Sequence, residues 1–428
     1  MRSLTCSTDL LARARKVIPS ATQTFSKGPN QWVRGVSPHY LTRGDGAWVW
    51  DADGNKYLDY LMALGPIILG YRNGHVDEAV KRQVDFGPIF SQMHPLEVEV
   101  AELLVDLIPC AEMVRFAKNG SDATTGAVRA ARAYTGREHV ACCGYHGWHD
   151  WYIGTTTRNK GVPKAVAGLS HAFVYNDVAS LEALFAEFPG GIAAVVMEPI
   201  GVEMPKPGYL TTVRELCTKN GAILVFDEIV TGFRLHLGGA QAHFGVNPDL
   251  ACFGKAMANG YPLAAVVGGR DLMMIFDEIF FSGTFGGDVL ALAACRATVN
   301  EMKSKNVIAH NWRIGASLRE GLEQLISRHG LSDVVRILGL PVRSVMAFPN
   351  CDEKEMLMRR SFVMQECVKR GLLYFGSNNV CFAHNEPEVR FTLDIFAEVL
   401  PLVAAAFQAN DFAERLEGLP VEPIFRRA

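Results

Sequence analysis

"AILVFDEIVTGFR", residues 222–234, joins a short apolar run to two adjacent carboxylates. The run Ala222–Phe226 has the length and the aliphatic composition of a buried strand, and Asp227 and Glu228 follow it at once. A carboxylate in such a place is costly unless something positive meets it. The stretch therefore predicts a strand that ends in a polar site, and it raises the question of the positive partner.

The same arrangement recurs along the middle of the chain, where short apolar runs alternate with helix-like stretches. The runs are Met113–Ala117, Ile192–Met197, Ala222–Phe226, Leu250–Phe253 and Leu263–Val267. This alternation predicts an α/β fold with a mostly parallel central sheet that helices cover on both faces. Ligands bind outside the carboxyl ends of the strands in such sheets. We therefore expect the polar motifs at these ends, NGSDA, Glu198, Asp227 and Lys255, to converge on one site.

The two ends of the chain have a different pattern. Helical stretches at 309–328, 353–369 and 393–407 alternate with strands such as 341–346 and 372–375, which predicts a smaller α+β layer. Near the N-terminus, GAWVWDADGNKYLDY has the alternation and the turn residues of a β-hairpin that could join this layer. We expect residues 1–64 to contribute to the small domain, 65–300 to form a large cofactor-binding domain, and 301–428 to form the rest of the small domain.

The composition excludes several classes of protein. The chain has 428 residues, 49% of them hydrophobic and 20% charged, and a formal net charge of -3. These values predict a soluble globular protein without the basic surface that nucleic acids require. No apolar window reaches the length of a membrane span, and the ten cysteines form neither a C-x-x-C pair nor a zinc pattern. We expect a cytoplasmic protein with a small-molecule partner and no bound metal.

Lys255, in CFGKAMANGYP, and Asp227 each have an ordinary interpretation. A lysine after a strand is usually a surface residue, but inside a cleft desolvation makes it a nucleophile toward aldehydes. An aspartate after a strand usually caps a helix or pairs with a nearby base such as Arg234. The two together suggest pyridoxal phosphate, because a pyridine ring held between them needs the aspartate to keep its nitrogen protonated.

A phosphate site would have to accompany such a ring, and KNGSDATTGAVRAARAY is the candidate. Gly120 permits a tight turn, while Ser121 and Asp122 begin a helix whose first amides can bind an anion. The glycine-bracketed loop FSGTFGGD offers the hydroxyl of Thr284 to the same phosphate. The ordinary alternatives are a helix cap and a plain turn.

The stretch GYHGWHDW, residues 144–151, allows three interpretations. Tyr145 could stack on the ring. A metal site could instead use His146, His149 and Asp150, although their spacing is not a zinc pattern. The third interpretation is a set of core aromatics with capping histidines.

The motifs NGSDA, YHG, MEP, FDEIVTGFR and GKAMANGYP, in this order, resemble the class III aminotransferases of fold type I, the aspartate aminotransferase-like fold, and particularly glutamate-1-semialdehyde aminomutase. The resemblance covers about residues 9–400. It implies that Lys255 forms a Schiff base with pyridoxal phosphate and that Asp227 pairs with the pyridine nitrogen, which would answer the opening question. Ile229 and Tyr145 would then pack against the two faces of the ring.

The resemblance also implies how the rest of the cofactor is held. Gly120 and Ser121, at the start of the helix that includes Asp122, would bind the phosphate. Thr284 of a neighbouring subunit would assist them, which implies a homodimer with shared active sites. His146 and Glu198 would belong to the cofactor network without reacting.

The chain departs from the aminomutase pattern at positions that select the substrate. Lys27 stands near an arginine position of the mutase, Asn378 stands where the mutase has a glutamate nearby, and Glu203 stands where it has an asparagine. Amides and hydroxyls suit a polyol, and the TQTFSKGP and HGWHDWYIG stretches are similar to enzymes that aminate sugars for cell-surface polysaccharides. The hypothesis is a transaminase that moves an amino group from L-glutamate to a sugar aldehyde or ketone, such as an octulosonate-type precursor of lipopolysaccharide. The alternatives are a glutamate-1-semialdehyde 2,1-aminomutase and, in another class, a metal-dependent hydrolase or binding protein that uses the two histidines.

Overall fold

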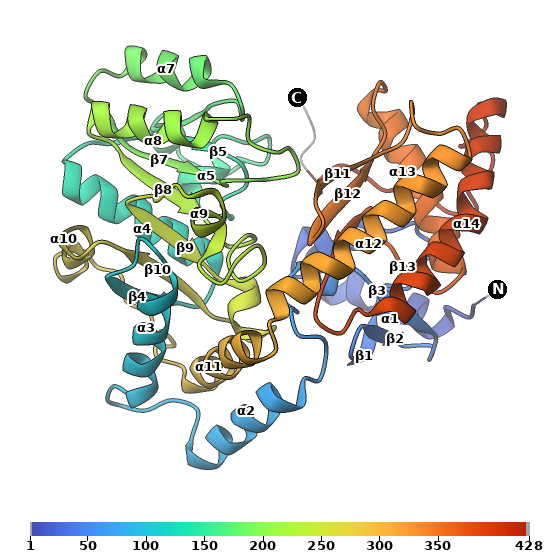
Figure 1. Cartoon of the computed structure of the whole chain (residues 1–428), viewed down its shortest axis with the longest axis horizontal. Helices are drawn as coiled ribbons and strands as arrows, with labels where there is room; N and C mark the ends of the chain where they lie inside the picture. The colour runs from blue at the N-terminus through green and yellow to red at the C-terminus, as the bar shows by residue number, and fades with distance from the viewer. Residues whose placement is uncertain (1, 425–428) are drawn as a thin grey trace. The chain divides into compact units, whose positions relative to one another are not determined.

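The structure is a computed structural model that describes residues 2–424 (Figure 1). The chain forms two compact units. Residues 74–308 form the large unit, and the segments before 74 and after 308 together form the small unit.

A seven-stranded sheet forms the centre of the large unit, in the order β4-β10-β9-β8-β7-β5-β6. Its strands are β4 (Met113–Ala117), β5 (His139–Cys143), β6 (Ser170–Ala172), β7 (Ile192–Met197), β8 (Ile223–Asp227), β9 (Leu250–Phe253) and β10 (Ala264–Gly268). The predicted mostly parallel sheet is confirmed, with β10 as the one antiparallel strand between β4 and β9. Because β4 and β9 both oppose β10, the carboxyl ends of β4, β9, β8, β7 and β5 lie along one edge of the sheet.

The helices of the large unit are α2 (Gly74–Phe86), α3 (Pro95–Leu107), α4 (Gly120–Thr135), α5 (Asp150–Ile153), α6 (Lys164–Ala167), α7 (Val178–Glu187), α8 (Tyr209–Asn220), α9 (Gly239–Phe244), α10 (Arg270–Met273) and α11 (Val289–Ser304). Of these, α3, α4, α8 and α10 contact strands of the sheet, while α2 packs against α11. Every residue of β7, β8, β9 and β10 is buried, as covering on both faces requires. The buried side of α4 is rich in alanine, including Ala123, Ala127 and Ala131, so this helix can approach β7, β9 and β10 closely. The sheet thereby fixes the start of α4 at its carboxyl edge.

The small unit contains two sheets. One has the order β1-β2-β3-β13, formed by β1 (Leu41–Asp45), β2 (Trp48–Asp51), β3 (Lys56–Asp59) and β13 (Leu372–Leu373). The other is antiparallel, with β11 (Arg336–Leu340), β12 (Arg343–Ala347) and β14 (Ser377–Asn379). The predicted hairpin is therefore present as β2 and β3, and it pairs with the C-terminal part of the chain through β13.

The helices of the small unit pack against these sheets. They are α1 (Thr5–Val17), α12 (Val307–Arg328), which begins in the large unit, α13 (Glu353–Lys369) and α14 (Glu386–Ala409). The helix expected at 393–407 starts earlier than predicted. Asn385 and Glu388 form a capping box there, with a proline in the first turn, and this polar start hid the extra turns from the apolar pattern. No helix within residues 2–424 is long and apolar enough to cross a membrane.

Candidate active site

Asp227 ends strand β8 at the carboxyl edge and is bonded on both oxygens. Its Oδ2 lies 2.8 Å from Nδ1 of His146, and its Oδ1 accepts the N–H of Ile229 at 3.1 Å. The other ring nitrogen, Nε2, lies 3.1 Å from the carbonyl oxygen of Cys143. Because a carbonyl only accepts, Nε2 must carry a hydrogen, and a further proton must lie between Nδ1 and the carboxylate. Within the chain, the partner of the buried carboxylate is thus the imidazole of His146.

The ring of His146 is held on all sides, with 0% of its side chain exposed. The indole of Trp151 stacks over it at 6.0 Å between ring centroids, and the ring of Tyr152 meets it edge-on at 5.2 Å. Thr124, on α4, donates its hydroxyl to the carbonyl oxygen of His146. These contacts fix the imidazole, and through it the direction in which Asp227 points.

Lys255 follows β9, the strand next to β8. It opens the short helical turn Lys255–Ala258 with a φ of 38°, in the left-handed region that costs a non-glycine residue roughly 1–3 kcal/mol. The side chain is half-buried. Strain of this kind persists only where the surrounding structure imposes it, which is the case here because β9 pairs with β8 and β10 on its two sides.

Ile229 connects these parts of the site. A Cβ atom added to Gly120, at the start of α4, would lie 3.0 Å from Cδ1 of Ile229. A Cβ atom added to Gly254, immediately before Lys255, would lie at the same distance from that atom. The side chain of Ile229 is therefore wedged between the start of α4 and the turn that presents Lys255.

The start of α4 is arranged to receive an anion. Asn119 and Asp122 form a capping box in which Oδ2 of Asp122 accepts the backbone and side-chain N–H groups of Asn119. At the first turn of any helix the leading amides, here those of Gly120 and Ser121, have no helical acceptor. The hydroxyl of Ser121 accepts the N–H of Trp148 at 3.3 Å, which leaves its hydrogen available to a ligand. Asp122 thus caps the helix, whereas the amides of Gly120 and Ser121 have no acceptor within it, and their role toward a phosphate stays a prediction.

Glu198 follows β7 and holds the backbone before His146. Its Oε1 accepts the N–H of Tyr145 at 2.9 Å, and a Cβ atom on Gly144 would collide with that oxygen at 2.8 Å. The side chain of Tyr145 is half-exposed. Burial raises the pKa of the Tyr145 hydroxyl, and the charge of Asp227 adds to the effect, so the phenol lies within electrostatic range of that carboxylate.

Glu228 is a buried carboxylate whose partners the sequence did not reveal. It is 0% exposed, and it accepts the hydroxyl of Thr231 and the N–H groups of Ala240 and Gln241, at the start of α9. Burial raises its pKa against these donors. The second carboxylate of the opening stretch therefore ties β8 to α9 and is not part of the reactive group. Thr231 lies three residues away, but the two backbone partners lie 12 and 13 residues downstream in an unremarkable stretch, so no local signal could have found them.

The geometry does not support the metal interpretation of the histidines. Both nitrogens of His146 are occupied, as described above, and Nδ1 of His149 lies 2.8 Å from the hydroxyl of Thr125. Asp150 begins α5. Among the described residues, no group of three or more His, Cys, Asp or Glu side chains could hold a metal ion.

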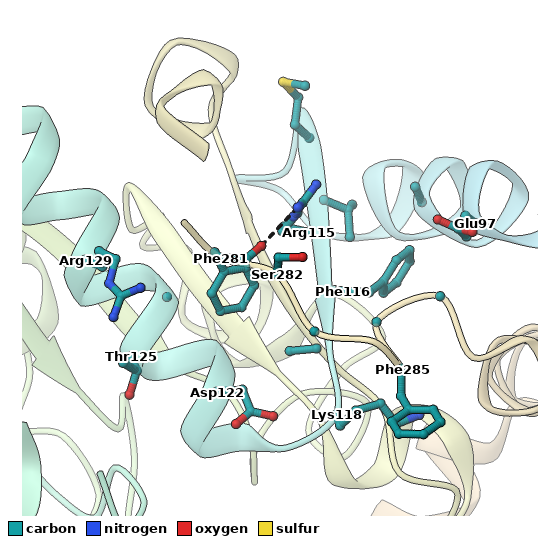
Figure 2. A pocket seen from close by; sticks show the side chains of 18 of the residues that line it. Glu97, Arg115, Phe116, Lys118, Asp122, Thr125, Arg129, Phe281, Ser282 and Phe285 are labelled. Atoms are coloured by element: carbon teal, nitrogen blue, oxygen red, sulfur yellow. Dashed lines mark hydrogen bonds between the residues drawn. The ribbon is translucent and has the colours of Figure 1, made fainter. Parts of the chain in front are cut away.

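Within its own chain, Thr284 does not belong to the cluster around Asp227 and Lys255. It is exposed on the segment between β10 and α11, and it lines a cavity of about 1050 Å³ bounded by α3, β4, α4 and that segment (Figure 2). Figure 2 shows Asp122 and Thr125 facing the cavity from α4, with Arg115 donating to the carbonyl oxygen of Phe281. Neither Lys255 nor Asp227 lines this cavity.

The three residues predicted to contact the substrate are in different places. Glu203 is exposed in the large unit, after β7, and its Oε1 accepts a hydrogen bond from Asn176. Lys27 and Asn378 belong to the small unit. Burial raises the pKa of Asp59 and the charge of Lys27 opposes this rise, so the ammonium of Lys27 lies within electrostatic range of that carboxyl group. Asn378 is buried on β14 and donates to the hydroxyl of Ser344. Their roles toward a substrate stay predictions.

The cluster in the large unit fits pyridoxal phosphate. A carboxylate with a fixed direction can accept from a pyridinium N–H, an amine stands on the neighbouring strand end, and a helix start offers amides and a hydroxyl to a phosphate. The clash distances at Gly120 and Gly254 show that the start of α4 and the turn before Lys255 both lie close to Ile229.

Comparisons with known proteins agree with this fit. The sequence model of the family "Aminotransferase class-III" matches residues 32–384. The 3-aminobutyryl-CoA aminotransferase of Cloacimonas acidaminovorans (strain Evry) is 35% identical over 92% of this chain and 96% of its own. The glutamate-1-semialdehyde 2,1-aminomutase of Roseiflexus castenholzii (strain DSM 13941 / HLO8) is 38% identical over 91% of this chain and 97% of its own.

Solved structures give the same result. The FumI protein of Sphingopyxis sp. MTA144, in its PLP internal aldimine form, aligns with a TM-score of 0.88 and 30% identity over 97% of this chain and 99% of that one. An omega-transaminase from Sphaerobacter thermophilus aligns with a TM-score of 0.84 and 27% identity over 93% of this chain and 98% of that one.

Proposed function

Because the chain belongs to the class III aminotransferases, which are pyridoxal-phosphate-dependent enzymes of fold type I, we propose that it moves an amino group from L-glutamate to the carbonyl carbon of an aldehyde or ketone. The observation that carries the proposal is the contact of His146 with Asp227 at the end of β8, with Lys255 just after the neighbouring strand β9. The cofactor supplies an electron sink for a carbanion next to nitrogen.

Each residue of the cluster then has a proposed task. Asp227 accepts the N–H of the pyridinium and holds its proton in place, and His146 keeps the carboxylate in the direction that this requires. The amides of Gly120 and Ser121 bind the phosphate, while Ile229 supports one face of the ring. Tyr145, held by Glu198 through its backbone, covers the other face.

Lys255 carries out the proton transfers. With the cofactor bound, the amine of Lys255 would hold it until an amino donor takes its place. The free amine would then be the base that removes the proton from the donor's α carbon and the acid that returns a proton during the transfer. With the acceptor the same steps run in reverse, so the product of the donor leaves before the acceptor binds.

The proposed acceptor is a hydroxylated carbonyl compound, such as an octulosonate-type sugar acid. The support is the exposed carboxylate of Glu203 after β7, together with Lys27 and Asn378 in place of groups expected in the aminomutase. A carboxylate and an amide both accept hydrogen bonds from sugar hydroxyls. The second candidate is a glutamate-1-semialdehyde 2,1-aminomutase, and the names of several relatives favour it.

The two candidates differ in whether an external donor is needed. The enzyme, loaded with cofactor and converted to its aminated form by L-glutamate, should pass the amino group to oxo sugars and release an amino sugar that mass spectrometry detects. Efficient isomerisation of glutamate-1-semialdehyde without any donor, combined with no amination of the oxo sugars, would contradict the transaminase proposal.

We also propose a homodimer in which Thr284 of one subunit completes the phosphate site of the other. The support is that Thr284 lies exposed beside a cavity that borders α4, and not within its own chain's cluster. Mixed Lys255→Ala and Thr284→Ala proteins, allowed to exchange subunits, should recover up to about a quarter of wild-type activity, because hybrid dimers contain one intact site. No recovery despite proven exchange would contradict the sharing.

A further inference from the structure

The connection between β7 and α8 lies at the carboxyl edge but lacks regular structure. From residue 198 to residue 208 the backbone forms neither helix nor strand. Two side chains of the loop between β6 and α7 hold it in place. Tyr175 donates its hydroxyl to the carbonyl oxygen of Pro199 at 2.8 Å, and Asn176 forms hydrogen bonds further along the connection, beginning with Glu203.

Asn176 uses nearly its whole hydrogen-bonding capacity on this connection. Its Nδ2 donates to Oε1 of Glu203 and to the carbonyl oxygen of Met204, both at 2.8 Å. Its Oδ1 accepts the N–H of Lys206 at 2.8 Å, and the Nζ atom of Lys206 donates to the carbonyl oxygen of Asn176 at 3.1 Å. The side chain of Asn176 therefore fixes residues 203, 204 and 206, on the two sides of Pro205.

No other residue type suits this position equally well. The φ of Asn176 is 62°, in the left-handed region that asparagine tolerates better than most residues, and the side chain is 7% exposed. An aspartate would fit the space, but it would lose both donors and place a carboxylate against Glu203. An amide, and not merely a polar side chain, is required.

The connection lies beside the site described above. Burial raises the pKa of Tyr175, and its neighbours Tyr209, Cys143, Glu203 and Glu198 each add to the effect, so Glu198 and Glu203 both lie within electrostatic range of its hydroxyl. Glu198 in turn holds the backbone of Tyr145. The connection exposes Val202, Glu203 and Met204, an acidic residue between two apolar ones.

We propose that Asn176 is a positioning residue for substrate selection, which fixes residues 201–206 as a rim of the active site and thereby presents Glu203 to a hydroxyl group of the acceptor. The inference rests on the proposed function, because it assigns the rim to the acceptor. The apolar side chains of Val202 and Met204 would contact the carbon backbone of the same molecule.

Three variants of the full-length, cofactor-loaded enzyme test the proposal. Asn176→Asp removes the donors to Glu203 and Met204. Asn176→Asp combined with Glu203→Gln restores one hydrogen bond with donor and acceptor exchanged, but it leaves no carboxylate on the rim. Asn220→Asp is the matched control, since it removes an amide that donates only to the carbonyl oxygen of Leu216 within α8.

The first measurement on each variant is the limiting rate of its half-reaction with saturating L-glutamate. The second is KM and kcat with D-glyceraldehyde as the hydroxylated acceptor probe. The third is hydrogen exchange of the backbone amides at residues 201–206. For Asn176→Asp we expect a limiting rate within about twofold of wild type and a KM for the probe that rises about tenfold or more, with faster exchange. The double variant should recover slow exchange and keep the high KM. Asn220→Asp should change none of these values.

An unchanged KM in Asn176→Asp, or a fall in kcat and cofactor content instead, would overturn the proposal, because Asn176 would then serve the fold alone. Failure of the wild-type enzyme to react with L-glutamate would refute the proposed function. This measurement on the wild type tests the function separately from the role of Asn176. In that case the exchange comparison still reports whether Asn176 fixes the rim, and unaltered exchange would overturn that part as well.

Discussion

Nδ1 of His146 lies 2.8 Å from Oδ2 of Asp227, and both side chains are almost inaccessible to water. The two residues stand 81 positions apart, one after β5 and the other at the end of β8. Their contact therefore depends on the order of the sheet, in which only β7 separates these strands. It also means that the imidazole of His146 sets the direction of the carboxylate.

Replacing His146 by asparagine should lower kcat by roughly 10–100-fold, the effect typical of outer hydrogen-bond partners of a reactive site. The cofactor should still bind, because the phosphate donors on α4 are untouched. Steady-state kinetics and the visible absorption of the bound cofactor measure the two effects. The exposed His243, replaced by asparagine, is the control and should behave as wild type. Equal kcat values in the two variants would show that Asp227 does not need His146.

Asp227→Ala should lower kcat by roughly 10²–10³-fold or more, since it removes the charge that the pyridinium requires. Some cofactor should remain bound through the phosphate site, which a titration followed by absorption would show. Near-normal turnover in this variant would be incompatible with the role assigned to Asp227.

Gly120→Ala should weaken cofactor binding, because its Cβ atom would press on Ile229 at 3.0 Å. Adding Ile229→Ala, which removes the three contacting atoms Cδ1, Cγ1 and Cγ2, should restore part of the affinity. Gly74→Ala is the control, since nothing lies within 4 Å of its Cβ position. Dissociation constants for pyridoxal phosphate test this ranking, and a double variant no better than Gly120→Ala would contradict the proposed wedge.

The strands next to the site could be predicted because each is a short apolar run with a polar residue at its end. Met113–Ala117, Ile192–Met197 and Leu250–Phe253 match β4, β7 and β9 residue for residue, and the run before Asp227 differs from β8 by one residue. β5 and β6 were not predicted. They begin near His139 and His171 and are short, so their apolar signal is weak.

The contacts that complete the site could not be read from the sequence. The motif around His146 marks the residue, but only the folded sheet brings its ring to Asp227. In the same way, the bonds from Asn176 to residues 203–206 join two irregular loops, and neither has a periodic pattern. Sequence patterns predict elements, whereas pairs of side chains from separate connections depend on the packing of the whole layer.

Glu228→Gln should lower the free energy of unfolding by about 1–3 kcal/mol, because its N–H₂ group would replace one of the two acceptor oxygens and face the N–H of either Ala240 or Gln241. Differential scanning calorimetry measures the loss as a lower Tm. The exposed Glu182 on α7, replaced in the same way, should leave Tm unchanged. A Tm for Glu228→Gln that equals this control would show that the buried carboxylate does not tie β8 to α9.

His384 should make the protein less stable in acid. The ring is fully buried, its Nδ1 accepts the N–H of Cys381, and its Nε2 lies 3.1 Å from the carbonyl oxygen of Asp59, so the neutral form is satisfied. Burial lowers its pKa to about 3. The unfolded chain binds a proton below about pH 6.5, while the folded chain does not, so stability is lost as the pH falls from about 6.5 toward 3.

Between pH 6.5 and 3, the His384 imidazole should lower the free energy of unfolding by about 1.4 kcal/mol for each unit of pH. Urea unfolding at pH 7 and at pH 5 measures it, and the difference between the two values should shrink in His384→Gln. The exposed His75, replaced by glutamine, should keep the wild-type difference. If the His384 variant kept it too, the buried ring would not be the source.

The visible absorption of the purified enzyme, recorded with pyridoxal phosphate before and after addition of L-glutamate, tests the central claim most directly. We predict a yellow protein whose visible band fades on addition of glutamate, while Lys255→Ala binds the cofactor without the wild-type band and does not turn over. A wild-type protein that gains no colour with pyridoxal phosphate, or a Lys255→Ala variant that transaminates at the wild-type rate, would contradict the account.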